Sequence, residues 1–164
     1  MSKLLSVLLD VVRQLQAAQR ERDPIAGKTK KRTTPPTRRV EHGVRVEYSP
    51  DLDGDADPGE VVWAWVPFED DPTRGKDRPV VVIGRVGRGD LAAVPLTSKN
   101  TGRSGQVPVG TGGWDRQGRP SWAKVDRLIT IDEDDVRREG SALARDRFDD
   151  VVDQLSRYHE VVRS

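Results

Sequence analysis

The spacing of apolar residues divides the chain into two parts. Over residues 3–22 apolar side chains recur at intervals of three and four, which predicts an amphipathic helix. They are Leu4, Leu8, Val11, Leu15 and Ala18. About two heptads are too few to define a coiled coil. The apolar face is therefore open to three interpretations: packing on its own domain, dimerisation, or binding to a membrane surface.

From residue 44 onward the pattern changes to short, valine-rich runs and alternation, both typical of β-strands. The expected strands span residues 44–48, 61–66, 79–85, 91–96, 121–126 and 128–131. The sequence VGRGD between the third and fourth runs predicts a hairpin turn, and residues 110–120 form a glycine-rich loop.

A last amphipathic segment, residues 144–162, predicts a C-terminal helix with one core-facing side. Its apolar positions are Phe148, Val151, Val152, Leu155, Tyr158 and Val162. Strands followed by one helix predict a mainly β fold, a small, partly open antiparallel barrel covered by that helix. The domain organisation is then an amphipathic helix at 1–22, a basic proline-containing linker at 23–43, and a barrel domain at 44–164.

The charge distribution separates the same parts. Residues 1–43 hold 10 Lys and Arg against 4 Asp and Glu, a net of +6, whereas residues 44–164 have a net of −5. The linker contains two adjacent prolines and a basic cluster without periodicity. Such an arm is either solvated or contacts RNA by counterion release. It is also open whether residues 1–43 inhibit the barrel domain.

Residue counts exclude several chemistries. The chain has no cysteine and two histidines, which excludes disulfides and thiolate sites and disfavours a two-histidine ribonuclease or a histidine-rich metal centre. No metal or other cofactor is expected. No apolar run reaches the roughly 20 residues of a membrane span. Asp10 interrupts the only signal-like stretch, so a cytoplasmic location is expected.

Two local motifs suggest sites without matching them. The sequence DLDGDADPGE, from Asp51 to Glu60, has the alternating aspartates of a calcium loop, but its glycine and glutamate are displaced from the EF-hand positions. An acidic turn is the better interpretation. The spacing of Gly84, Gly87 and Gly89 does not fit a dinucleotide-binding loop.

A third candidate site combines three segments that are far apart in sequence. GKDRP begins one expected strand, PLTSK ends its hairpin partner, and AKVDR lies in a later strand. In an antiparallel pair these two ends meet at one rim, so Arg78 should lie near Thr97 and Ser98. Lys124 and Asp126, two residues apart on one strand face, would complete the group. The alternative is ordinary rim ion pairs, with Asp77 bound to Arg78 and Asp126 to Lys124 or Arg127.

These segments resemble a known family. PGEVVWAWVPFEDDPTRGKDRPVVVIG, AAVPLTSK and VDRLITID are similar to the PemK/MazF toxins of bacterial toxin–antitoxin pairs, over residues 58–158. The resemblance implies a small SH3-like barrel that forms a homodimer. It also implies metal-independent, sequence-specific cleavage of single-stranded mRNA, and inhibition by an antitoxin peptide that lies across the active groove.

The resemblance also implies roles for individual residues. Arg78 matches the family's loop arginine, Thr97 and Ser98 its hydroxyl pair, and Asp126 its strand carboxylate. Lys124 stands where the family has arginine, which replaces a bidentate fork with a point charge. Arg78, Asp126, Lys124 and Thr97 are the expected catalytic residues. Substrate binding is expected from Ser98, Lys99, Lys76, Arg74 and Arg127.

For metal-independent cleavage the substrate's 2′-hydroxyl serves as nucleophile. Asp126 would then be the base, Arg78 and Lys124 would hold the phosphoryl oxygens, and Lys124 or Arg78 would be the acid. Two alternatives stay open: a catalytically weak module that binds RNA or a partner, and a gyrase-directed toxin. The cleavage motif and the antitoxin's identity do not follow from the sequence.

Overall fold

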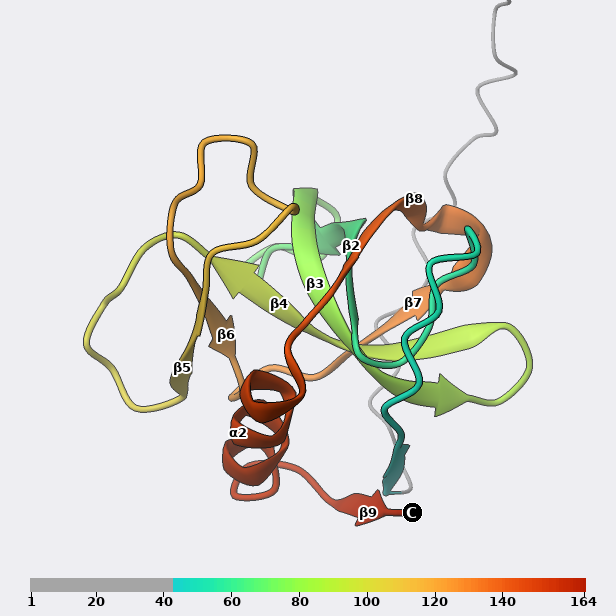
Figure 1. The fold of residues 1–164 in the computed structure, drawn as a ribbon. Helices are drawn as coiled ribbons and strands as arrows, with labels where there is room; N and C mark the ends of the chain where they lie inside the picture. Colours follow the sequence, from blue (N-terminus) through green and yellow to red (C-terminus); the bar gives the residue numbers. More distant parts are fainter. Residues whose placement is uncertain (1–42) are drawn as a thin grey trace, which may run out of the picture. The chain divides into compact units, whose positions relative to one another are not determined.

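The computed structural model describes residues 43–164, except for the side chains of residues 138 and 139 (Figure 1). The predicted helix at 1–22 and nearly all of the predicted linker lie outside the described residues. Within 43–164 the predicted fold class, mainly β with one C-terminal helix, is confirmed. In this part of the chain no helix is both long and apolar enough to cross a bilayer.

Six strands match the predicted runs: β1 (Val44–Val46), β2 (Glu60–Pro67), β3 (Gly75–Val86), β4 (Asp90–Thr97), β6 (Ser121–Lys124) and β7 (Ile129–Asp132). Three more are β5 (Gln106–Gly110), β8 (Arg137–Ala142) and β9 (Val161–Arg163). Seven of them form one antiparallel sheet in the order β5-β6-β4-β3-β2-β8, with β7 also paired to β4. The order ends at β5 and β8, so the sheet is open at these two edges.

The central strand β3 is buried on both faces. Val80 and Val82 are in one hydrophobic cluster with β2, β4 and β7, while Val81 and Ile83 are in the other with α2 (Arg145–Leu155). All four side chains are fully buried. A strand covered on both sides needs a continuous apolar run, and that is the pattern the sequence shows there. The ends of β3 are consequently fixed by a rigid core.

The predicted helix at 144–162 is wrong in its extent. Helix α2 ends at Leu155, and the chain returns as β9, which pairs in parallel with β1 through Val44 and Val161. Val162 is 49% exposed and Tyr158 44% exposed, so neither belongs to the apolar face of the helix. The β-branched pair at 161–162 favours a strand, and β1 offers it an unpaired edge. The second cause depends on β1, which is remote in sequence.

Strand β1 crosses β3 at a glycine. A β-carbon added to Gly84 would lie 2.2 Å from the carbonyl oxygen of Arg45, so only glycine allows this approach. The β3–β4 register also shifts at this point, between Val82 and Gly84. On the rim side of this bulge Val80 to Val82 still pair with β4, and only Gly75 to Pro79 pair with β2 alone.

Candidate functional site

The hairpin of β3 and β4 brings the beginning of one strand and the end of the other to the same rim. Val80 pairs with Pro95, and β3 begins at Gly75 whereas β4 ends at Thr97. A cavity of about 260 Å³ opens here. Its lining residues are Trp63, Lys76, Asp77, Arg78, Pro79, Leu96, Thr97, Ser98, Lys99, Trp114, Asp115, Arg119 and Ser121. We call this the rim cavity.

Five residues predicted from sequence line the rim cavity together. They are Lys76, Arg78, Thr97, Ser98 and Lys99. The hydroxyl oxygen of Thr97 accepts a hydrogen bond of 3.1 Å from the backbone N–H of Lys99, which forms a tight turn directly after β4. That turn keeps the Thr97 hydroxyl at the cavity edge.

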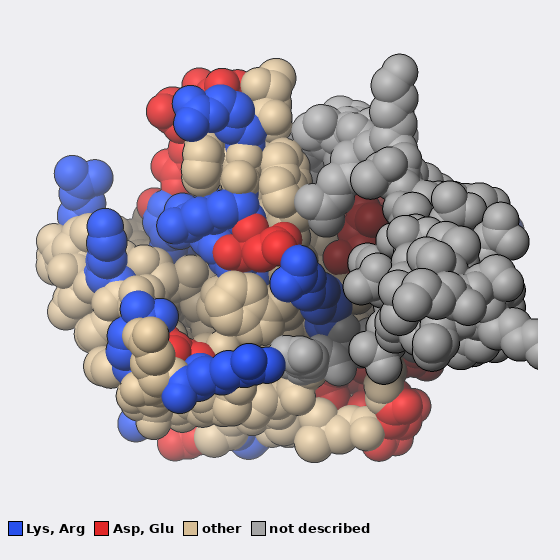
Figure 2. Space-filling model, turned by 90° about the horizontal axis from the view of Figure 1, so that it is seen from above, with Lys and Arg blue, Asp and Glu red and all other residues tan. Residues whose placement is uncertain are grey.

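The rim cavity has an excess of positive charge. Four of its side chains are cationic and two are carboxylates, and Lys and Arg side chains gather around this end of the molecule in Figure 2. Asp77 is bound to Arg137 at 2.8 Å. Lys76, Arg78 and Lys99 form no ion pair with the part of the chain that the structure describes. The predicted Asp77–Arg78 rim pair is therefore wrong, and the three cations are available to an anion.

Arg78 has a further unsatisfied group. Its Nε atom is buried and has no hydrogen-bond partner among residues 43–164. A buried, unpaired N–H of a guanidinium costs free energy unless a ligand satisfies it. Pro79 follows at once, and its ring restricts the backbone of Arg78 to extended conformations. The side chain is thus held at the cavity in a state that favours an oxygen acceptor.

The glycine-rich loop between β5 and β6 forms the opposite wall. Trp114 is 3% exposed, and its Nε1 donates a hydrogen bond of 3.1 Å to the Ser121 hydroxyl. Trp63 of β2 donates from its own Nε1 to the Trp114 carbonyl oxygen, also at 3.1 Å. A β-carbon on Gly112 would overlap the Trp114 ring, so this position requires glycine. The loop is anchored to the sheet by its tryptophan.

The same loop holds Arg119 at the cavity. Asp115 accepts hydrogen bonds from Arg119 Nε at 2.8 Å and from the Gln117 backbone N–H at 2.8 Å. The Arg119 guanidinium and this N–H lower the pKa of the Asp115 carboxyl. The carboxylate therefore stays ionised and fixes where the guanidinium lies.

Lys124 and Arg127 lie outside the lining of the rim cavity and share a carboxylate, Glu69. Lys124 Nζ is bound to Glu69 Oε1, and Arg127 Nη1 lies 3.9 Å from the same oxygen. Arg127 also donates from Nη2 to the Pro67 carbonyl oxygen at 2.5 Å. Both cations are paired with Glu69, and neither forms the predicted ion pair with Asp126. We call Glu69, Lys124 and Arg127 the Glu69 cluster.

Asp126 does not complete the group at the cavity. The predicted strand 121–126 ends at Lys124, and a turn follows in which the Arg127 N–H bonds to the Lys124 carbonyl oxygen at 3.0 Å. The expectation that Lys124 and Asp126 share a strand face is therefore wrong. Asp126 lies beside Gly105, at the far end of the β5–β6 hairpin from Ser121.

Arg74 stacks over the Phe68 ring at 5.7 Å and does not line the cavity.

Six residues of the site were not predicted from the sequence: Trp63, Trp114, Asp115, Arg119 and Ser121 at the cavity, and Glu69 beside it. The sequence contains a signal for Asp115 and Arg119. Asp115 directly follows Trp114 and lies four residues before Arg119, in a loop otherwise rich in glycine. A large aromatic in such a loop indicates that the loop packs on something. Glu69 had no comparable signal, because its cations come from β6 and the turn after it.

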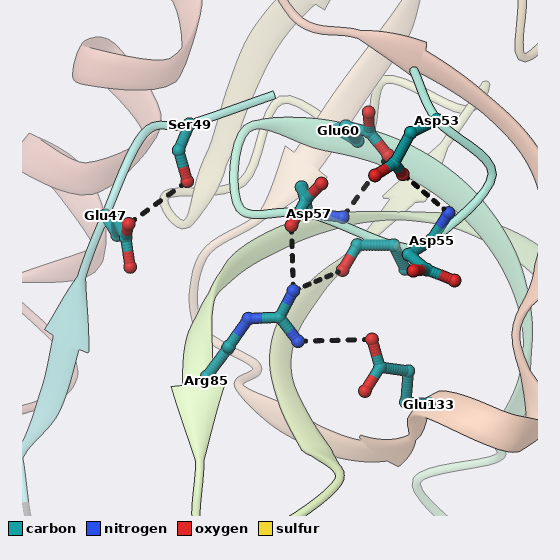
Figure 3. A network of polar contacts seen from close by, with 9 residues as sticks. Glu47, Ser49, Asp53, Asp55, Asp57, Glu60, Arg85 and Glu133 are labelled. Atoms are coloured by element: carbon teal, nitrogen blue, oxygen red, sulfur yellow. Dashed lines mark hydrogen bonds and ion pairs between the residues drawn. The ribbon is translucent and has the colours of Figure 1, made fainter. Parts of the chain in front are cut away.

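The acidic stretch forms a separate cluster on another part of the domain (Figure 3). Arg85 Nη2 lies 2.7 Å from Asp57 Oδ1, and its Nη1 lies 3.1 Å from Glu133 Oε1. Asp53 accepts a hydrogen bond of 3.0 Å from the Asp55 N–H, as in an acidic turn. Among residues 43–164, no group of three or more His, Asp or Glu side chains is arranged to hold a metal ion.

Comparison with known proteins identifies relatives of this domain. Residues 57–159 match the family model described as PemK-like, MazF-like toxin of type II toxin–antitoxin system. No curated protein sequence matches the chain. Similar solved structures include a MazE–MazF complex from Deinococcus radiodurans, at 22% identity, covering 62% of this chain and 93% of that one with a TM-score of 0.45.

Two further structures are similar to the same extent. MazF from Deinococcus radiodurans is 22% identical over 63% of this chain and 94% of its own, with a TM-score of 0.46. The Mycobacterium tuberculosis toxin MazF-mt6 is 18% identical over 62% of this chain and 98% of its own, with a TM-score of 0.45. The family model covers more than half of the chain, and the assignment rests on it.

Proposed function

The chain belongs to the PemK-like, MazF-like toxins of type II toxin–antitoxin systems, and we propose that it acts as an endoribonuclease on single-stranded RNA. The proposed reaction uses the substrate's 2′-hydroxyl and no metal. Cleavage of mRNA in the cytoplasm would inhibit growth until an antitoxin binds. A homodimer and an antitoxin peptide across the groove are further parts of this proposal.

The observation that supports the proposal best is the composition of the rim cavity. Lys76, Arg78 and Lys99 line it without an ion-pair partner among the described residues, next to the hydroxyls of Thr97 and Ser98. Cations and hydroxyls are the groups that bind phosphate oxygens. The cavity opens at the surface, and the backbone of a single strand enters such a site more easily than the backbone of a duplex does.

The chemistry then proceeds as follows. A base removes the proton of the 2′-hydroxyl, and the resulting alkoxide forms a bond to phosphorus while the bond to the 5′-oxygen breaks. Arg78 stabilises the charge that develops on the phosphoryl oxygens, and Thr97 orients the phosphate. The leaving 5′-oxygen takes a proton from an acid. The products carry a 2′,3′-cyclic phosphate and a 5′-hydroxyl.

Two carboxylates compete for the role of base. Asp126 is the family's expected residue, but it lies outside the lining of the rim cavity, whereas Asp77 is in that lining. Geometry is the first requirement for a general base, so the proposal favours Asp77. Asp77→Asn and Asp126→Asn compared at equal protein concentration decide between them. For the acid, a lysine is better suited than arginine, and Lys76 and Lys99, which line the rim cavity, are the candidates.

The ion pair between Lys124 and Glu69 favours a second candidate, a catalytically weak module that binds RNA. A lysine held by a carboxylate is less available to a reacting phosphate. No specific observation favours the gyrase-directed alternative, and α2 ends at Leu155 before the chain returns to β1, so the described residues include no extended C-terminal helix.

The test is incubation of the purified protein with a long single-stranded RNA in EDTA, followed by mapping of the ends. We expect discrete cuts with 5′-hydroxyl ends, reduced by about 10²- to 10³-fold in Arg78→Ala. Arg88→Ala is the matched control, since Arg88 is exposed in the turn at the other end of the same hairpin.

Ends that carry 5′-phosphates, or cleavage that stops with EDTA, would contradict the proposed reaction. Intact RNA with a folded protein that still binds it would favour the binding module. Equal losses in Arg78→Ala and Arg88→Ala would point to a general effect of charge and remove Arg78 from the site.

A further inference from the structure

One carboxylate, Glu69, is held by cations that come from a distant part of the chain. Lys124 Nζ is bound to Glu69 Oε1, and Arg127 Nη1 approaches the same oxygen at 3.9 Å. Lys124, Arg127 and Arg78 together lower the pKa of the Glu69 carboxyl, the hydrogen bond from Lys124 contributing most. Glu69 is 55 residues from Lys124 in sequence, so only the fold brings the two together.

The cations of the Glu69 cluster are fixed, and the carboxylate is the exposed member. The side chains of Lys124 and Arg127 are 25% and 18% exposed, whereas that of Glu69 is 60% exposed. Lys124 belongs to β6, and Arg127 is anchored by its bond to the Pro67 carbonyl oxygen. Glu69 lies in the loop between β2 and β3. The anion can therefore leave while the cations stay in place.

A single carboxylate does not neutralise this region. Among the described residues, the carboxylates of Glu69 and Asp126 interact favourably with the Arg127 guanidinium. The Arg78 guanidinium repels it. Burial, and then repulsion from Arg78, lowers the pKa of Arg127 despite the two carboxylates. Two guanidiniums that repel one another favour an anion between them. The region also adjoins the rim cavity, because Ala123, which precedes Lys124 in β6, pairs with Leu96 of the cavity lining.

A carboxylate and a phosphodiester present oxygens to the same donors at similar distances. We propose that Lys124 and Arg127 form a second phosphate-binding subsite, beside Arg78, and that Glu69 occupies it in the free protein as an intramolecular competitor. A phosphodiester of the RNA strand displaces Glu69 when the strand enters the rim cavity. The inference rests on the proposed function, since it names where a second phosphate of the same substrate binds.

The size of the effect follows from the exposure of the pair. An exposed ion pair is weak, and its contribution is what the RNA must replace. Removal of the competing carboxylate should tighten RNA binding by about 1.4- to fivefold. The gain should fall with added salt.

The test is fluorescence anisotropy of the full chain with a short, labelled 2′-O-methyl RNA, which has no free 2′-hydroxyl and is not cleaved. Glu69→Gln should bind it about 1.4- to fivefold more tightly than the wild type. Asp70→Asn is the matched control, because it removes the same charge from the neighbouring exposed position, which has no ion pair within residues 43–164. In the Lys124→Ala background, Glu69→Gln should give a smaller gain.

Three results would overturn the inference: a gain equal to that of Asp70→Asn, weaker binding in Glu69→Gln, or the same gain with and without Lys124. An acidic peptide as competitor provides a further arm. If Glu69→Gln tightened binding of a polyglutamate peptide but left the 2′-O-methyl RNA unchanged, the subsite would belong to a protein partner and the RNA assignment would fail. Cleavage of ordinary RNA is measured separately, so loss of the proposed activity and loss of this subsite are distinguishable.

Discussion

The indole N–H of Trp63 donates a hydrogen bond of 3.1 Å to the carbonyl oxygen of Trp114 and so joins β2 to the loop between β5 and β6. The two residues are 51 positions apart in sequence. Because both line the rim cavity, this bond fixes the distance between the cavity's two walls. It also places the Asp115–Arg119 pair, which follows directly after Trp114.

Trp63→Phe should remove this hydrogen bond while keeping an aromatic ring in the wall. The Trp114 carbonyl would lose its partner, and we expect the free energy of unfolding to fall by about 0.5 to 1.5 kcal/mol. Urea unfolding followed by circular dichroism measures it. Trp122→Phe is the control, since the Trp122 side chain makes no hydrogen bond to the described residues. Equal stability of the two variants would show that the bond contributes nothing.

Thr97→Val should lower the rate of RNA cleavage by about 10²-fold, because the change keeps the branched shape and removes the hydroxyl that orients the phosphate. Binding of 2′-O-methyl RNA should change much less. Initial rates at saturating RNA give the first quantity and anisotropy the second. Thr101→Val is the control, since that hydroxyl bonds to Gln106 outside the cavity lining. A rate unaffected by Thr97→Val would exclude the hydroxyl from the reaction.

Lys99→Ala and Lys76→Ala should each reduce the salt dependence of RNA binding. A lysine that neutralises one phosphate of a single strand releases its counterions, so each substitution should lower the slope of log K against log salt by about 0.7. Titrations at four or five salt concentrations measure the slope. Arg88→Ala should leave it unchanged. A slope that stays constant in both lysine variants would place the strand elsewhere.

Glu60→Gln should stabilise the protein relative to the wild type, and by more at neutral pH than at acid pH. Burial is the main cause that raises the pKa of Glu60, and Asp57, Asp53 and Asp51 add to it. Glu60, Asp57 and Asp53 are seen together in Figure 3. A raised pKa in the folded state means that ionisation disfavours folding, so the wild type loses stability as the pH rises above about 4.5. Glutamine cannot ionise and still accepts the hydrogen bond from the Asp57 N–H.

The difference in free energy of unfolding between Glu60→Gln and the wild type should therefore be more positive at pH 7 than at pH 4. Urea unfolding at the two pH values measures it. Glu160→Gln gives the control, because Glu160 is exposed. A difference that is the same at both pH values would show that Glu60 ionises in the folded state without penalty.

Local sequence determined most of the strands and one rim of the site. The valine-rich runs predict strands from a few neighbouring residues each, and the tight VGRGD turn fixes the register of the two strands that it joins. Arg78 and Thr97 could be placed together for this reason alone. The charge pattern of GKDRP indicated a site, and its proline limited the backbone of Arg78.

Tertiary structure decided where the other polar groups lie. The Ser121–Asp126 segment was expected to bring Lys124 and Asp126 to the cavity, but the strand ends at Lys124. Glu69 binds that lysine, and Asp126 lies beside Gly105. The C-terminal helix ends early because β1 pairs with Val161. Ion pairs and parallel pairings between distant segments depend on the packed core that aligns them, and no short-range pattern in the sequence contains that information.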